Sequence, residues 1–315
     1  MNYNKNKNIQ KTMNLILDKT TTRRQTLKGF AALSIGMTSI IVGNSPIVKS
    51  GFMDNFFNKH YKEMTNDYKK KLFKKLIKNT YTEYGVNISI SDPQPIKGVR
   101  FAYCLNLSKC NGSRRCVTAC VKENNQSRNP AIQYIKVLEM NMGSINLEAG
   151  DMYYEGKSVP NKNKFYLPVQ CHHCYNAPCV TVCPVEATWV QEDGICVIDY
   201  EWCIGCRYCM AACPYGARRF NFKRPSIPRS KINPNQGFLS NIIRSAGVVE
   251  KCHFCLHRTR NGEYPACLEA CPTGARKFGN LNDPDSEVSY IISKKRVFVL
   301  KEELNTIPSF FYYFD

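Results

Sequence analysis

Sulfur chemistry is the first possibility that this sequence raises, because 17 of its 315 residues are cysteine. Fifteen of these cysteines fall into four compact groups between residues 110 and 271. Disulfide-rich secreted domains distribute their cysteines at irregular intervals through loops, whereas metal sites bring several ligands together over short stretches of chain. The grouping therefore favours metal ligation over a disulfide framework.

Three of the groups keep all four thiols and end in the same Cys-Pro pair. They read Cys171-x2-Cys174-x4-Cys179-x3-Cys183-Pro184, Cys203-x2-Cys206-x2-Cys209-x3-Cys213-Pro214 and Cys252-x2-Cys255-x11-Cys267-x3-Cys271-Pro272. The middle one is the bacterial ferredoxin run, in which three cysteines bind one iron–sulfur cluster and the fourth binds another. Zinc sites favour two separated pairs of ligands. The repeat predicts ferredoxin-like units that each hold two clusters.

The first group, Cys110-x2-Ser113-x2-Cys116-x3-Cys120, keeps the spacing but has a serine at its second ligand position. A hydroxyl is a harder and much less acidic ligand than a thiol, so it is a poor donor to iron. Three outcomes are open: a [3Fe–4S] cluster, a fourth bond from Ser113 or from nearby Cys104, or no cluster. We expect a three-iron or atypically ligated cluster.

Several other residues could contribute to such a site. Cys196 fits no group, and we interpret it as a small buried thiol. His172, His173, His253 and His257 are additional to complete cysteine sets, which argues against a Rieske centre and favours N–H donation to cluster sulfur or to a partner. Arg207, Arg218 and Arg219 could tune a reduction potential, bind a partner or be solvated surface charges.

The elements that must position these groups are short strands and helices in an α+β fold. The Asp193-Gly194 pair between residues 188–190 and 195–199 predicts a β-hairpin. Residues 124–165 form a polar insertion. Residues 52–81 show the spacing of a basic amphipathic helix, whose basic face could lie on an anionic membrane surface, dock to a partner or be the solvated face of an ordinary docked helix. The apolar residues 296–315 either pack on a partner or close the chain's own core.

The charge is concentrated near the N-terminus, where residues 1–80 carry 16 Lys and Arg against 4 Asp and Glu. This distribution disfavours nucleic-acid binding. Residues 21–28 contain Arg23-Arg24 and resemble a twin-arginine export signal, and the apolar residues 29–42 follow it. We therefore expect a signal or retained anchor over residues 1–50, a helical segment over 51–96 and the cluster domain over 97–315. We expect the protein on the periplasmic side, held at the membrane by partners or by the anchor.

In order and spacing, the four groups resemble the four-cluster iron–sulfur subunit shared by dimethyl sulfoxide reductase, nitrate reductase and polysulfide reductase complexes. The resemblance implies two ferredoxin-like units with long insertions and four clusters, three of them [4Fe–4S]. It implies the following ligand sets: Cys110, Ser113, Cys116 and Cys271 for the atypical cluster; Cys120, Cys252, Cys255 and Cys267; Cys171, Cys174, Cys179 and Cys213; and Cys183, Cys203, Cys206 and Cys209.

A cluster with every ligand position filled by protein can pass an electron but has no position for substrate. We find no nucleotide-binding loop, flavin fingerprint or Ser–His–Asp arrangement. The sequence thus predicts a non-catalytic electron-transfer subunit. The resemblance implies two partners, namely a molybdopterin or hydrogenase catalytic subunit and a membrane quinone-reactive subunit or cytochrome. The alternative is a free-standing soluble periplasmic polyferredoxin.

Overall fold

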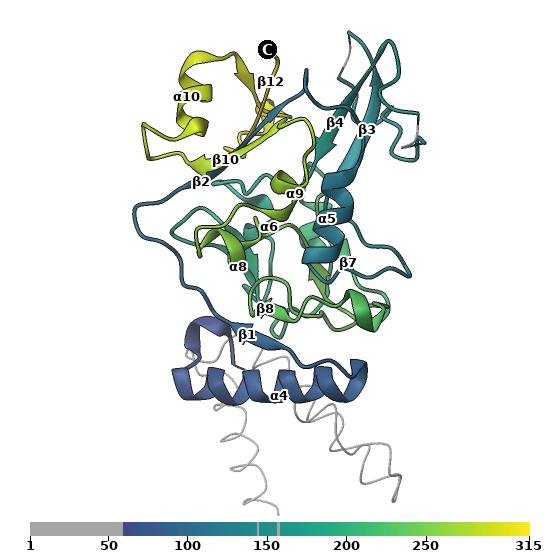
Figure 1. Ribbon diagram of the computed structural model, residues 1–315. Coiled ribbons are helices and arrows are strands. Elements are labelled where there is room, and N and C mark those ends of the chain that lie inside the picture. Colours follow the sequence, from purple (N-terminus) through teal and green to yellow (C-terminus); the bar gives the residue numbers. More distant parts are fainter. Residues whose placement is uncertain (1–58, 144, 156–157) are drawn as a thin grey trace, which may run out of the picture.

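The structure, a computed structural model, describes residues 59–143, 145–155 and 158–315. Its strands and short helices form one body above a long helix, with the C-terminus at the opposite end (Figure 1). The twin-arginine segment and the apolar stretch that follows it lie outside the described residues.

A four-stranded sheet closes the upper part of the body, with the strand order β10 (Arg276–Asn280), β2 (Phe101–Asn106), β12 (Phe310–Tyr313), β11 (Val297–Phe298). Strand β2 is buried along its whole length. It pairs antiparallel with β10 and parallel with β12. Alternate residues of a strand face opposite sides, so Tyr103 packs into the main core while Cys104 packs under α10 (Glu287–Lys294). The C-terminal stretch therefore completes the chain's own core.

Two-stranded pairs make up the rest of the β structure. The hairpin predicted at Asp193-Gly194 is present, with β5 (Thr188–Val190) antiparallel to β6 (Cys196–Ile198) and Gly194 at φ +79°. The polar insertion forms the antiparallel pair β3 (Lys136–Asn141) and β4 (Lys164–Val169). Strand β7 (Arg219–Phe220) pairs with β9 (Val249–Glu250), and β1 (Ser89–Ser91) pairs parallel with β8 (Asn235–Gly237).

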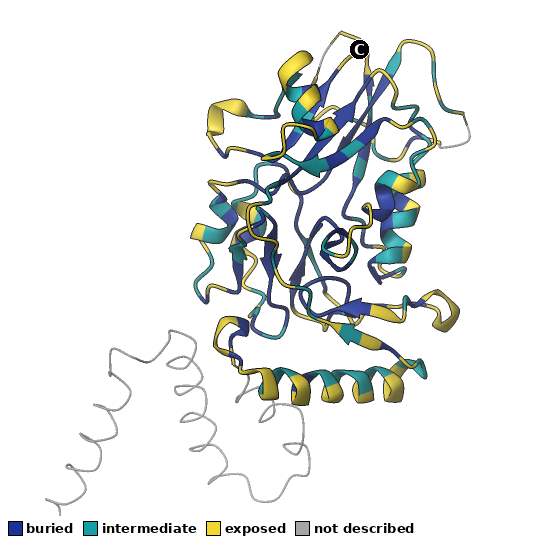
Figure 2. Cartoon of the chain, turned by 60° about the vertical axis from the view of Figure 1, so that its left-hand side comes forward, coloured by how far each residue is buried: buried dark blue, intermediate teal, exposed yellow. Residues whose placement is uncertain are grey.

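The basic helix is shorter than the sequence predicted. A 3₁₀ turn (Tyr61–Glu63) precedes it, and α4 (Asn66–Tyr84) starts where the Thr65 hydroxyl accepts from the Tyr68 N–H and ends at the left-handed Gly85. The extended backbone of Thr65 is what separates the two pieces. One side of α4 packs on the body through contacts such as Phe73 with Phe238, and its other side is exposed (Figure 2). Within the described residues, the apolar side of α4 is docked on the body and most of its lysines face outward, and contact of that basic side with a membrane or a partner stays a prediction.

Five short helices lie among the cysteines: α5 (Arg115–Glu123), α6 (Pro178–Thr181), α7 (Tyr208–Ala211), α8 (Leu256–Thr259) and α9 (Ala266–Glu269). The dark interior in Figure 2 runs through this region, where most of the cysteines are buried. The fold is a mixed α and β arrangement, as expected. Across the described residues, no helix combines the length and the apolar character that a membrane crossing requires.

Candidate functional site

The four cysteine groups share one backbone conformation at their first loop. The residue immediately before the second ligand position has a positive φ in every group, namely Gly112 (74°), His173 (46°), Gly205 (71°) and Phe254 (53°). Non-glycine residues adopt this conformation rarely, and it persists where surrounding structure requires it. Successive N–H groups in such a loop form a concave surface that suits an anionic group.

The first group reproduces the third one almost residue for residue. Gly112 and Arg114 have φ values of 74° and 56°, and the corresponding Gly205 and Arg207 have 71° and 64°. In both groups the arginine precedes a helix, α5 or α7. Ser113 therefore occupies the loop position that Cys206 occupies in the intact group, on the same backbone.

A second repeat follows the Cys-Pro pairs. Cys183, Cys213 and Cys271 each accept a backbone N–H from the third residue after them, and that residue is left-handed in all three. A buried alanine comes next, at 187, 217 and 275. Pro ends the local helix after the cysteine. The first group has Val121 in place of Pro, and there α5 continues past Cys120 to Glu123.

Two small, partly open cavities bring together cysteines from the ends of the domain. One is lined by the residues that we name set 1: Cys110, Ser113, Cys116 and Cys271. The other is lined by set 2: Cys120, Cys252, Cys255 and Cys267. Several thiols that converge on one cavity fit a bound inorganic group.

The remaining predicted ligands form two further neighbourhoods. Burial, together with the thiols of Cys171 and Cys213, raises the pKa of Cys174 to about 12. Cys179 also interacts with Cys171, so these four thiols, set 3, are neighbours. Burial is likewise the main cause that raises the pKa of Cys203, and Cys183 and Cys206 add to it. With Cys209, which interacts with Cys183 and Cys203, they form set 4.

The four sets follow one another through the protein. Cys267 of set 2 interacts with Cys116 of set 1, and Cys252 of set 2 interacts with Cys171 of set 3. Arg218 donates to the Cys179 sulfur of set 3, and its charge also attracts Cys209 of set 4. The order is therefore set 1, set 2, set 3, set 4. All four cysteines of set 2 are buried, whereas the three cysteines of set 1 are half-buried and Cys206 of set 4 is exposed.

Hydrogen-bond donors surround the thiols of set 2. The amides of Asn124 and Gln126 donate to the Cys120 sulfur at 3.4 and 3.2 Å, and the Tyr103 hydroxyl lies 3.4 Å from the Cys267 sulfur. Burial, with the neighbouring thiols, raises the pKa of Cys120 well above its usual value. Because metal ligation requires thiolates, such a site needs strong positive charge to hold its ligands ionised. A cluster supplies that charge, and the amide donors then stabilise the ligating sulfur.

Cys104 and Cys196 differ from their predicted roles. Cys104 packs with Ala102 and α10 on the face of β2 opposite set 1, so the suggestion that it replaces the missing thiol is wrong on the geometry of the strand. Cys196 is buried, as predicted, but its sulfur also lies 3.8 Å from the Arg218 nitrogen that donates to Cys179 of set 3. Apart from the alternation of the hairpin strand, nothing in the sequence indicates that contact.

The predicted histidines lie against the sets as well. His253 lines the set 2 cavity, and neither of its buried ring nitrogens has a hydrogen-bond partner within the described residues. His173 Nδ1 accepts the Cys196 N–H at 3.0 Å, so the proton of the neutral ring is on Nε2, which is buried without a partner. Burial lowers the pKa of both histidines well below the usual value. His257 instead contacts Glu123 at 2.7 Å.

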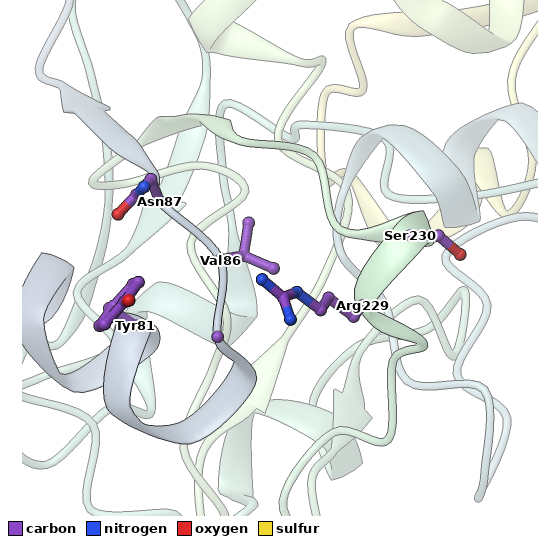
Figure 3. Close-up of a pocket in the computed structure, with 6 residues that line it drawn as sticks. Tyr81, Val86, Asn87, Arg229 and Ser230 are labelled. Atoms are coloured by element: carbon purple, nitrogen blue, oxygen red, sulfur yellow. The ribbon is translucent and has the colours of Figure 1, made fainter.

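An open hollow at the end of α4 belongs to a different part of the surface (Figure 3). Tyr81, Val86 and Asn87 line it together with Arg229 and Ser230, and no cysteine is among its lining residues. The Arg229 guanidinium lies close over Gly85, where a Cβ atom would meet it at 3.3 Å. The hollow lies between the C-terminal end of α4 and residues 229–230, away from the cysteine sets. Among the described residues, no three Cys, His, Asp or Glu side chains are placed to bind a single metal ion. The cysteines of sets 1 and 2 instead line cavities.

Comparison with known proteins agrees with this geometry. Residues 162–230 and 241–281 match the family model of the 4Fe-4S dicluster domain. A Halobacterium salinarum protein named as the iron–sulfur subunit of a dimethyl sulfoxide reductase is 43% identical over 67% of this chain and 78% of its own length. A subunit of the selenate reductase of Mesobacillus selenatarsenatis is 37% identical, over 70% and 73%. The Hdr-like menaquinol oxidoreductase iron–sulfur subunit 1 of Archaeoglobus fulgidus is 41% identical, over 62% and 71%.

Proposed function

We propose a function for this chain from its family: it belongs to the iron–sulfur subunits of the dimethyl sulfoxide reductase type. In this proposal it conducts electrons through four clusters between a catalytic subunit and a membrane partner. Iron–sulfur clusters accept and release single electrons without bonding to substrate. The chain itself is then non-catalytic, and its residues hold, insulate and tune the clusters.

Each set supplies the ligands of one cluster in this proposal. Sets 2, 3 and 4 each offer four thiols and would hold [4Fe–4S] clusters, in two ferredoxin-like units that exchange their fourth ligands. Set 1 offers three thiols and the Ser113 hydroxyl, so it would hold a [3Fe–4S] or atypically ligated cluster. The matching loop backbones of sets 1 and 4 support a cluster in set 1, because the cradle is kept although one thiol is absent.

The observation that carries the proposal is the order of the sets together with their exposure. Sets 2 and 3 are buried except for the half-buried Cys213, and sets 1 and 4 lie at the two ends of the series, where the cysteines of set 1 are half-buried and Cys206 of set 4 is exposed. An electron can therefore enter at one end and leave at the other. Around Cys206, the side chains of Ile204, Tyr208 and Phe222 are exposed, which makes the set 4 end a suitable contact for a protein partner.

The partners that we propose follow from the named relatives. Those relatives are subunits of dimethyl sulfoxide reductase, selenate reductase and a menaquinol oxidoreductase. We propose a molybdopterin or hydrogenase catalytic subunit on one side and a quinone-reactive membrane subunit or cytochrome on the other. We also propose export by the twin-arginine route to the periplasmic side, with Arg23 and Arg24 as the recognised pair.

Anaerobic purification of the native protein from membranes tests this function. We expect it to co-purify with a larger catalytic subunit and to contain iron in four clusters. We also expect the intensity of the cluster EPR signals to change in opposite directions when a quinol analogue and when the substrate of the catalytic subunit is added. A monomer in the soluble fraction, with clusters but without associated molybdenum, nickel or haem subunits, would instead identify a diffusing polyferredoxin. Absence of iron after anaerobic reconstitution would refute both.

A further inference from the structure

Three buried cations have no carboxylate partner within the part of the chain that the structure describes. They are Arg218, Lys251 and Arg276, and each is 1–3% exposed. Other buried arginines are paired: Arg260 lies 2.7 Å from Asp193, and Arg244 lies 3.4 Å from Glu250. A buried charge without a counter-charge is very unfavourable. Each of the three cations contacts a sulfur or carbonyl oxygen of at least one cysteine.

Arg276 lies between set 1 and set 2. One terminal nitrogen of its guanidinium donates to the Cys116 sulfur at 3.5 Å. The other is 4.0 Å from the Cys267 sulfur and donates to the Gln170 side chain at 3.0 Å. A single side chain thus contacts one thiol of each of the two neighbouring sets.

Lys251 and Arg218 occupy the next two intervals. The Lys251 ammonium donates to the carbonyl oxygen of Cys252 in set 2 at 2.7 Å and to that of Cys196, whose sulfur shares one Arg218 nitrogen with Cys179 of set 3. Arg218 donates to the Cys179 sulfur at 2.9 Å, and its charge also attracts Cys209 of set 4. Its buried Nε has no acceptor within the described residues, which leaves an N–H for a group that the protein does not supply.

The two arginines are equivalent in the sequence repeat. Each stands five residues after a Cys-Pro cysteine, in Cys213-Pro-Tyr-Gly-Ala-Arg218 and Cys271-Pro-Thr-Gly-Ala-Arg276. Thr188 is at the same position after Cys183, and its hydroxyl accepts from Arg218 at 3.0 Å. Both units therefore place a fixed positive charge at the same point of their fold.

We propose that Arg276, Lys251 and Arg218 form a series of fixed charges, one in each interval between successive clusters, and that each raises the reduction potentials of the two clusters that flank it. This inference rests on the proposed function. Reduction adds one electron, and hence one negative charge, to a cluster, so a nearby buried cation stabilises the reduced form. A shared cation shifts the potentials of both flanking clusters in the same direction, so it changes the difference between them less than a charge beside one cluster would.

Redox titration of the clusters followed by EPR, under anaerobic conditions and at one pH, tests this series. Arg276→Gln should make two midpoint potentials more negative, Arg218→Gln should shift the other two, and Lys251→Gln should shift one from each pair. At the wild-type midpoint we expect the reduced-to-oxidised ratio of each affected cluster to fall about tenfold, which is a shift of ~59 mV for one electron. Arg276→Lys and Arg218→Lys keep the charge and should stay near the wild-type midpoints.

Lys277→Gln is the matched control, because Lys277 is the next residue of β10, faces away from the cavity and pairs with Glu287 at 2.6 Å. It removes the same charge and should leave all four midpoints unchanged. The series is refuted if the Gln variants retain their iron and EPR signals with unshifted midpoints, or if the Lys variants shift as much as the Gln variants. Loss of clusters from all three Gln variants would also overturn it, in favour of a purely structural role. Iron content in the wild type reports separately on the proposed function.

Discussion

Replacement of Ser113 by cysteine should convert the cluster of set 1 into a [4Fe–4S] cluster. The backbone of its loop already matches the intact loop of set 4, with φ differing by only a few degrees at Gly112 and Gly205, so the new thiol needs no rearrangement to reach the cavity. Metal sites with four protein ligands, such as structural zinc sites, bind with apparent free energies of about 10–16 kcal/mol, or roughly 3–4 kcal/mol for each ligand.

A difference of this size corresponds to a factor of ~10²–10³ in occupancy of the corner iron. The wild-type corner should therefore be almost empty, and the corner in Ser113→Cys almost full. Iron analysis should find one more iron in each chain, and the oxidised-state EPR signal of a three-iron cluster should disappear. Cys206→Ser is the matched control: the same change at the equivalent position of set 4 should lose one iron and create such a signal. A wild-type protein with four reduced [4Fe–4S] signals and no three-iron signal would refute the reasoning.

Three further predictions concern stability and export. Glu250→Gln leaves the buried Arg244 without a counter-charge. Because the ion pair is 3.4 Å long, we expect the free energy of unfolding to fall by about 3 kcal/mol, the lower end of the usual range for a broken buried pair. Anaerobic denaturant unfolding measures this loss, and an unchanged midpoint would contradict it. Burial raises the pKa of Asp199 to about 7, so the folded state binds more protons than the unfolded state below that pH. The free energy of unfolding should therefore fall as pH rises towards about 7 and then level off. Asp199→Asn should flatten this pH dependence in thermal unfolding between pH 5 and 8. If the substitution leaves the pH dependence intact, other titrating groups cause it. Replacement of Arg23 and Arg24 by lysine should leave the protein in the cytoplasmic fraction, and undiminished export would refute the twin-arginine assignment.

The four cysteine groups could be recognised from spacing alone because the members of a group are close in sequence, whereas the division into four ligand sets was expected from the family resemblance. Sets 3 and 4 come from one stretch of chain, and the hairpin at Asp193-Gly194 formed where its turn residues predicted it. The contacts of sets 1 and 2 could be expected only from the family resemblance, since they join residues far apart. The positions of the buried cations were harder to predict, because lysine and arginine are usually surface residues and Lys251 and Arg276 have no feature that marks them as buried. Only the repeated Cys-Pro-x-Gly-Ala-Arg pattern indicates that Arg276 and Arg218 share a role.

Two other differences have physical causes. The sequence suggested that Cys104 could serve set 1 because it is close along the chain, but strand alternation turns it to the opposite face of β2. Periodicity predicted one helix over residues 52–81, whereas among the described residues α4 starts only at Asn66, because Thr65 is extended and caps it. Apolar spacing does not detect such a cap, since it reports which side of a segment is buried and not where the segment begins.

The pairing of distant segments in set 2 sets an order of events during synthesis. Asn124, beside Cys120, contacts Cys255 across 131 residues of chain, whereas set 4 lies wholly within residues 183–209. A growing chain on the ribosome can thus bring the thiols of sets 3 and 4 together long before residue 267 emerges to complete set 2. In the proposed four-cluster protein, sets 1 and 2 would have to wait for Cys267 and Cys271, so a chain truncated before these residues would carry clusters only in sets 3 and 4.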